Sequence, residues 1–174
     1  YGDGDETTLV SFGGNPSNKF ITTYFRKTIN VANPAAFSAL TLRTLVDDGA
    51  VVYVNGIEVA RLFMPAGGIV FTNLSAATTE NALVTNNLSP ALLVVGANVI
   101  AVEVHQDAVN SPDLSFDLEL IASSPPQPLI LSGINVLGGN TTITVQGEPG
   151  SNVAMEFADS LSVPWIDLGR GALS

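Results

Sequence analysis

Short alternating runs of Val, Ile, Thr and Phe, interrupted about every ten residues by Gly, Pro, Asn or Asp, dominate this sequence. An alternation with a period of two places successive side chains on opposite faces of an extended chain, so it predicts half-buried β-strands separated by turns. No apolar period of the helical kind competes with it. The sequence therefore predicts an all-β protein. The strands predicted in its first 122 residues are 22–31, 40–46, 50–54, 57–61, 98–105 and 114–121.

The dipeptide Asn55-Gly56 is the most specific turn signal in the chain. Both residue types tolerate the positive φ angles that a two-residue turn between antiparallel strands requires. The pair therefore predicts a β-hairpin from 50–54 to 57–61. The following residues, 62–87, are rich in Ala, Thr, Asn and Gly and predict a long loop or short edge strands.

A proline-rich segment at 123–128, Ser-Ser-Pro-Pro-Gln-Pro, has the composition of a stiff linker. We therefore predict one module over 1–122 and a second over 129–174. The second stretch is about half of the ~100 residues that a β-sandwich needs, so it predicts an incomplete module. Because position 1 shows neither Met nor a leader pattern, we expect any signal peptide to have been removed. The strands predicted in the second module are 129–137, 141–146, 153–158 and 165–168.

Acidic residues outnumber basic ones by 16 to 6, which gives a formal charge of −10. Such a chain repels phosphate backbones and anionic lipid surfaces, which argues against nucleic-acid binding. Apolar runs such as 91–95 are far shorter than the ~20 residues of a spanning helix, which argues against membrane insertion. The absence of cysteine excludes disulfides, thiolate nucleophiles and cysteine zinc sites.

Two segments carry a family resemblance, DDGAVVYVNGIEVA at 47–60 and GANVIAVEV at 96–104. They resemble two strand signatures of galactose-binding-like jelly rolls, which occur as carbohydrate-binding modules and as sugar-binding domains of glycoside hydrolases. The resemblance implies a jelly-roll β-sandwich over roughly residues 1–122. It says little about the ligand, because the matching residues mostly build the sandwich. The family's opening strands are missing from this sequence, so either the chain is a fragment or another chain supplies that edge.

The C-terminal stretch carries a second resemblance. Residues 156–161 and 165–169 resemble the middle of fibronectin- or immunoglobulin-like repeats in large bacterial surface proteins. Together the two resemblances imply a secreted or cell-surface bacterial protein of several domains, with a jelly roll followed by part of a second β-sandwich.

Strand directions predict which loops share one end of the sandwich. If 40–46 runs toward one end, then Asp47 and Asp48 turn there, and the return strand brings Arg61 to it. The loop 106–113 joins this end if 98–105 also runs toward it. Carboxylates, amides and an imidazole can together bind the vicinal hydroxyls of a sugar. Our candidate ligand-binding residues are Asp47, Asp48, Arg61, His105 and Gln106, with Asn15, Asn18, Lys19, Asp107 and Asn110 nearby. The alternative is that this end is merely polar and hydrated.

No catalytic constellation is found in the sequence. His105 is the single histidine, so a histidine-rich metal site is excluded. On strand 98–105 it alternates with apolar residues and should point outward with Glu103, either toward a ligand or bonded to a neighbouring carbonyl or carboxylate. Asp47 and Asp48 are adjacent and diverge, so they do not form a glycosidase pair. We therefore expect a protein that is not an enzyme.

A calcium ion is expected from two acidic features. A hairpin between 98–105 and 114–121 would set Glu103 opposite Asp117, and like charges opposed on a sheet require a nearby cation. Either Arg26 or Ca²⁺ would supply it. Asp3, Asp5 and Glu6 alternate with glycine at the start of the chain, a pattern that suits the oxygen ligands of Ca²⁺, although a hydrated acidic turn is the alternative. The metal candidates are thus Asp3, Asp5, Glu6 and Asp117, with a structural role.

The aromatic residues limit the kind of glycan that the first module could bind. Sugar rings commonly stack on exposed Trp or Tyr. Trp165 lies in the second module, so the first has Tyr1, Tyr24, Tyr53 and phenylalanines. This argues against a flat crystalline polysaccharide as the ligand, and it is compatible with a short glycan at the loop end or with no sugar binding at all. The alternative function is a structural module that pairs its strand edges with neighbouring domains or chains.

Overall fold

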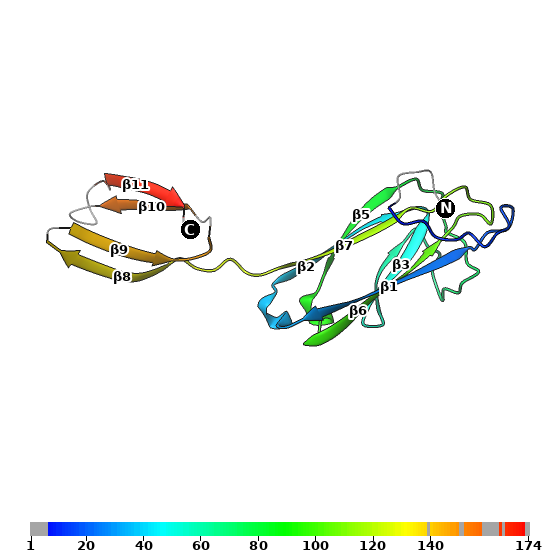
Figure 1. Ribbon diagram of the computed structural model, residues 1–174, viewed down its shortest axis with the longest axis horizontal. Helices are drawn as coiled ribbons and strands as arrows, with labels where there is room; N and C mark the ends of the chain where they lie inside the picture. Colours follow the sequence, from blue (N-terminus) through cyan, green and yellow to red (C-terminus); the bar gives the residue numbers. More distant parts are fainter. Residues whose placement is uncertain (1–6, 139, 150–151, 158–163, 165, 173–174) are drawn as a thin grey trace. The chain divides into compact units, whose positions relative to one another are not determined.

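The computed structural model shows two compact units, Tyr1–Ser124 and Pro125–Ser174 (Figure 1). It describes residues 7–138, 140–149, 152–157, 164 and 166–172. The described elements are antiparallel β-strands and two short 3₁₀ turns, η1 (Pro34–Ala36) and η2 (Pro90–Leu92), so the predicted all-β fold is confirmed. Within the described ranges, no helix is long and apolar enough to cross a membrane.

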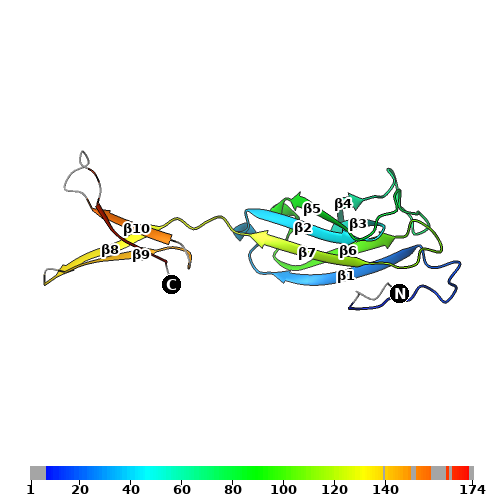
Figure 2. The same ribbon diagram turned by 90° about the horizontal axis from the view of Figure 1, so that it is seen from above.

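The first unit is a sandwich of two antiparallel sheets (Figures 1 and 2). The large sheet has the order β1-β6-β3-β4, and the small sheet has the order β5-β2-β7. The chain changes sheets repeatedly along its length, as in the jelly-roll arrangement that the sequence predicts. The strands are β1 (Thr22–Val31), β2 (Ala39–Val46), β3 (Gly49–Val54), β4 (Ile57–Leu62), β5 (Ala82–Leu88), β6 (Gly96–His105) and β7 (Phe116–Ser123).

The core lies between the inner faces of these sheets. Val52 and Val102 of the large sheet and Leu42 and Val46 of the small sheet belong to one buried cluster. Burying a side chain of this kind contributes about 1.5–3 kcal/mol. The alternating apolar positions read from the sequence are therefore the positions that hold the two sheets together.

The predicted hairpin at Asn55-Gly56 is confirmed. Val54 of β3 pairs with Ile57 of β4, which leaves Asn55 and Gly56 as the two turn residues. Their φ angles are 51° and 81°, as the two-residue turn requires. The segment that follows, 63–81, is a loop, and the edge strand β5 comes after it.

The predicted hairpin between the strands now labelled β6 and β7 is wrong. Strand β6 pairs with β1 and β3 in the large sheet, whereas β7 pairs with β2 in the small sheet. Glu103 therefore lies opposite Tyr24 and Val51, and Asp117 lies opposite Leu45. The loop 106–115 is long enough to cross between sheets, and this removes the like-charge pair.

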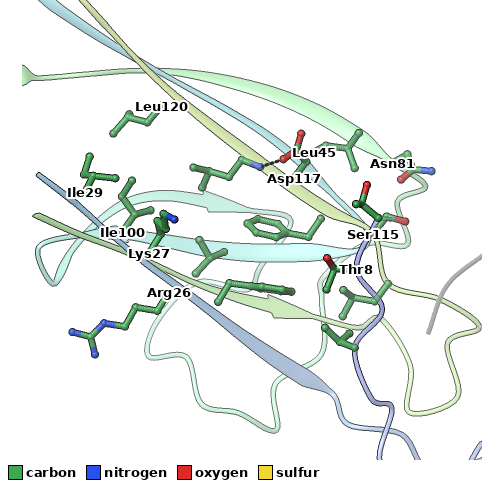
Figure 3. A pocket seen from close by; sticks show the side chains of 17 residues that line it. Thr8, Arg26, Lys27, Ile29, Leu45, Asn81, Ile100, Ser115, Asp117 and Leu120 are labelled. Carbon is green, nitrogen blue, oxygen red and sulfur yellow. Dashed lines mark hydrogen bonds between the residues drawn. The ribbon is translucent and has the colours of Figure 1, made fainter. Parts of the chain in front are cut away.

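A cavity of about 870 Å³ lies between the two sheets, along strands β1 and β7 (Figure 3). Its apolar lining comes from inner-face residues such as Phe25, Ile29, Phe116 and Leu120. Arg26, from the opposite face of β1, extends away from the other labelled side chains in Figure 3. It is therefore not placed to neutralise Asp117, as the sequence had allowed.

The second unit contains two antiparallel strand pairs. Strand β8 (Ile130–Leu137) pairs with β9 (Asn140–Gln146), and β10 (Asn152–Phe157) pairs with β11 (Ile166–Ala172). All residues of β8 are exposed, including its apolar ones. The described part of this unit therefore leaves apolar strand surface open to solvent.

Candidate functional site

Three strand ends meet at one end of the first unit, which we call the loop end. His105, the last residue of β6, lies opposite both Thr22, the first of β1, and Gly49, the first of β3. The segment before β1 also lies at this end, because the N–H of Lys19 donates to the carbonyl of Val109, in the loop after β6, at 2.7 Å. The loops that the sequence assigned to a common end are thus brought together.

Four of the five ligand-binding candidates at the loop end are nevertheless buried, while Arg61 is half-buried. Asp47 and Asp48 expose 2% and 1% of their surface, and His105 and Gln106 expose none. The loop 63–81 lies over them, and its Ser75 N–H donates to the carbonyl of Gln106 at 2.8 Å. A direct glycan contact by these side chains would require this loop to move aside.

Asp48 anchors two loops from beneath. Its carboxylate accepts the N–H groups of Thr79 and Asp107, each at 2.9 Å. Burial raises the pKa of Asp48, and the two N–H groups oppose that rise because they stabilise the charged form. The peptide bond between Asp47 and Asp48 is cis. In this structure Asp48 acts as a structural acceptor that joins the loops 63–81 and 106–115.

His105 points outward from the large sheet, as predicted, but the loop encloses it. Its Nδ1 lies 2.8 Å from the carbonyl oxygen of Asn73 and 3.0 Å from Oγ1 of Thr22. Because a carbonyl can only accept, Nδ1 carries the proton. Its Nε2 lies 3.5 Å from a carboxylate oxygen of Glu103. Of the two roles left open by the sequence, the observed contacts match a histidine hydrogen-bonded to a neighbouring carbonyl, while its Nε2 has no hydrogen-bond partner among the described residues.

Arg61 holds the beginning of the same loop. Its guanidinium donates to both oxygens of Glu58 at 2.8 Å and to the carbonyls of Pro65 and Gly67 at 2.7 and 2.9 Å. The hydrogen bonds to Arg61 lower the pKa of Glu58. Arg61 is therefore engaged within the protein and fixes the path of residues 65–67.

The metal candidates predicted from the sequence are not gathered in one place. Asp117 is exposed on β7, and its carboxylate accepts the N–H of Leu118 at 2.8 Å. Asp3, Asp5 and Glu6 lie outside the described residues. A different carboxylate group does form at the loop end, where single oxygens of Asp47, Glu80 and Asp113 all lie within 4.8 Å of one another. Burial and the neighbouring carboxylates raise the pKa of Asp47 to about 8.

The outer face of the large sheet carries a group of side chains that the sequence did not assign to a ligand site. Tyr24 lies on the same cross-strand row as Glu103, and the next row contains Arg26, Ala101 and Tyr53. Directly paired residues of antiparallel strands point to the same side. Their sequence neighbours Phe25, Val52, Ile100 and Val102 belong to the core, so the paired residues face outward. We call these five residues the Tyr24–Tyr53 face.

Ala101 forms the low centre of the Tyr24–Tyr53 face. It is flanked by Arg26 on β1 and Tyr53 on β3, strands that lie about 10 Å apart across β6. Tyr24 is 64% exposed. The loop 63–81 borders the face, because the carbonyl of Phe71 accepts from Thr22 Oγ1 at 2.7 Å. The alternation of Tyr53 with Val52 and Val54 was the sequence signal, but only the register places Tyr24 beside it.

A short hydrogen bond organises this face. The hydroxyl of Tyr53 donates to Oε1 of Glu103 at 2.7 Å. Burial, followed by this bond to Glu103, raises the pKa of Tyr53 to about 12. The pKa of Tyr24 is also raised, by burial and by the charge of Glu103. The carboxylate of Glu103 therefore lies between the hydroxyl of Tyr53, which donates to it, and the ring of His105.

We expect Tyr53→Phe to lower the free energy of unfolding by about 2 kcal/mol at neutral pH, because it removes a hydrogen bond to a nearly buried carboxylate. The pKa of Tyr53 is about 12 in the folded protein against 10.0 ordinarily. Its stabilising contribution is therefore complete below pH 10 and is lost as the pH rises through 12. Urea denaturation should show the difference between wild type and variant shrinking over this interval. A difference that stays constant would contradict the role of this bond.

Comparisons with known proteins give distant structural similarities. Neither a protein-family model nor a curated protein matches the chain. An α-L-rhamnosidase from Streptomyces avermitilis, solved with L-rhamnose, is similar over 88% of this chain and 12% of its own, at 17% identity and a TM-score of 0.45. A β-D-mannosidase from Dictyoglomus thermophilum is similar over 87% and 22%, at 14% identity and a TM-score of 0.40.

A β-glycosidase from Bacteroides vulgatus is similar over 83% of this chain and 19% of its own, at 12% identity and a TM-score of 0.36. The chain thus spans 12–22% of the length of these three structures.

Proposed function

We propose that the first unit is a non-catalytic carbohydrate-binding module of a secreted or cell-surface protein, and that its glycan lies on the Tyr24–Tyr53 face. The observation that carries this proposal is the exposed ring of Tyr24 beside a low, small residue, Ala101, with polar groups around it. This arrangement combines the two contacts that sugars need, a flat apolar surface and paired hydrogen-bonding groups.

The chemistry of the face suits a sugar ring. An aromatic ring offers a large apolar surface at low entropic cost, so Tyr24 can stack on the C–H face of a pyranose. The guanidinium of Arg26 donates hydrogen bonds, and the hydroxyl oxygen of Tyr53 can accept them, since its proton is donated to Glu103. The bond to Glu103 fixes the hydroxyl of Tyr53 before binding, which lowers the entropic cost of binding.

In this proposal the loop-end residues do not contact the glycan; they hold the loop that borders the glycan site. Asp48 and His105 hold the loop 63–81, and Phe71 of that loop borders the Tyr24–Tyr53 face. Phe71 is 67% exposed and could extend the stacking surface beyond Tyr24. We therefore assign the direct glycan contacts to the sheet face, while the loop end positions the loop beside it.

We expect Tyr24→Ala to weaken glycan binding at least about tenfold, because it removes roughly 1.5 kcal/mol of stacking. Tyr24→Phe keeps the ring and should retain most of the affinity, which makes it the matched control. A glycan array would select the ligand, and titration calorimetry would measure the dissociation constants. The absence of binding to any glycan at millimolar concentration would contradict the proposal, as would equal affinities for the wild type and Tyr24→Ala.

A second candidate function, assembly through strand pairing, is favoured by the cavity between β1 and β7. Among the described strands, β1 pairs only with β6 and β7 only with β2, so each leaves one edge open. Apolar residues such as Phe25 and Phe116 line the space between these edges. A strand from a second copy of the chain could pair there and cover them. Light scattering over a range of concentrations would test this, and a strictly monomeric chain would contradict it.

A further inference from the structure

The loop end contains a carboxylate cluster that the proposed glycan site does not use. Strand β2 lies between β5 and β7, and its last residue, Val46, pairs with Ala82 of β5 and Phe116 of β7. The residues just beyond this row are therefore neighbours in space although they are distant in sequence. They are Asp47 after β2, Glu80 before β5 and Asp113 before β7, with one oxygen of each within 4.8 Å of the others.

The buried side chain of Asp47 supplies a second, independent observation at this cluster. The residue is 98% buried, since it exposes 2% of its surface, and its Oδ2 atom accepts no hydrogen bond from an N–H or hydroxyl group within the described residues. The carboxyl group of Asp48 is its neighbour. Buried polar atoms are almost always bonded, and an unpaired buried carboxylate is costly. The backbone of Asp47 is held in place, because its N–H donates to the carbonyl of Ser115 at 3.0 Å.

We propose that Asp47, Glu80 and Asp113 bind one Ca²⁺ ion. Calcium takes six to eight oxygen ligands at about 2.3–2.6 Å, so two oxygens on one ion lie at most about 5 Å apart, as these do. The donors are all carboxylate oxygens, which suit a hard cation better than a transition metal. Glu80 is exposed, so water can reach the ion and complete its coordination shell.

The ion would join the ends of three strands of the small sheet. Asp47 adjoins Asp48, which already anchors Thr79 and Asp107, so the ion would act on the same two loops as that carboxylate does. This calcium site is separate from the glycan site on the large sheet, and either could exist without the other. It also differs from the positions expected from the sequence, Asp3, Asp5, Glu6 and Asp117.

The test uses the full chain, freed of metal with a chelator and then titrated with CaCl₂ by calorimetry and by thermal unfolding. We expect one ion per chain and a rise in Tm of at least about 5 °C at saturation. Glu80→Gln and Asp113→Asn should each weaken calcium binding at least about tenfold, because each removes one of three charged ligands. Both residues are at least partly exposed, so these variants should fold.

Asp117→Asn is the matched control, since it removes an exposed carboxylate from outside the cluster. It should bind calcium with the affinity of the wild type. The absence of binding heat and of any Tm shift in the wild type would overturn the proposal. Unchanged affinity in both Glu80→Gln and Asp113→Asn would also overturn it, because the ion would then lie elsewhere, for example at Asp3, Asp5 and Glu6.

Discussion

Asn98→Ala should lower the free energy of unfolding by about 3 kcal/mol, because it removes four hydrogen bonds of a fully buried side chain, three of them to part-buried backbone groups. Asn98 is fully buried at the start of β6. Its Oδ1 accepts the N–H of Val94 and the side-chain amide of Asn55, each at 2.8 Å. Its Nδ2 donates to the carbonyls of Val94 and Gly96 at 2.8 and 3.0 Å. Urea denaturation would measure the loss.

The bond between Asn55 and Asn98 also joins the segments 47–60 and 96–104. Asn55 forms the β3–β4 turn and accepts the N–H of Val99 at 2.9 Å, so the two turns are fastened to each other. Asn98→Asp keeps the shape but loses both donors, and it should be destabilised to a similar degree. Asn30→Ala, at an exposed asparagine of β1, should change stability by less than about 0.5 kcal/mol. A loss below about 1 kcal/mol in Asn98→Ala would contradict this account.

Gly49→Val should destabilise the protein by about 3 kcal/mol, because the loop 63–81 packs directly on this glycine. A Cβ atom at Gly49 would lie 2.7 Å from Oγ of Ser75 and 2.8 Å from Sδ of Met64. The loop would have to move outward, which would weaken the bond from the N–H of Ser75 to the carbonyl of Gln106. We therefore expect a lower unfolding midpoint in urea and faster hydrogen exchange at the amide of Ser75.

Gly68→Val is the matched control for this substitution, since no heavy atom lies within 4 Å of a Cβ built there. Its stability should stay within about 0.5 kcal/mol of the wild type. Met64→Ala should recover part of the loss when combined with Gly49→Val, because it vacates space beside the new side chain. If Gly49→Val and Gly68→Val had equal effects, close packing of the loop on Gly49 would be the wrong explanation.

The local sequence pattern predicts the strands of the first unit, but it does not predict which of them pair. A ten-residue connection follows His105 before β7 begins at Phe116, and a connection of this length allows a hairpin as well as a crossing between sheets. The core decides between them, because Phe116, Leu118 and Leu120 pack from the small sheet against the large one. The predicted opposition of Glu103 and Asp117 failed for this reason.

The candidate sites also combine features that the sequence predicts with features that only the packing of the chain decides. Reading strand directions brought Asp47, Asp48, His105 and Gln106 to a common end, because direction reverses at each short turn. Their burial was not readable, since the loop 63–81 that covers them has no periodic pattern. Glu80 was missed altogether, because its place beside Asp47 depends on β5 pairing with β2.

The sequence by itself determined the local structure: the predicted strands lie close to the observed ones, and Asn55-Gly56 forms the turn that its φ preferences require. These features depend on neighbouring residues along the chain. The tertiary structure decided which strands pair, which polar residues are covered, and which carboxylates and tyrosines meet. Those outcomes depend on how two sheets and a long loop pack together, so they arise from contacts between residues far apart in the sequence.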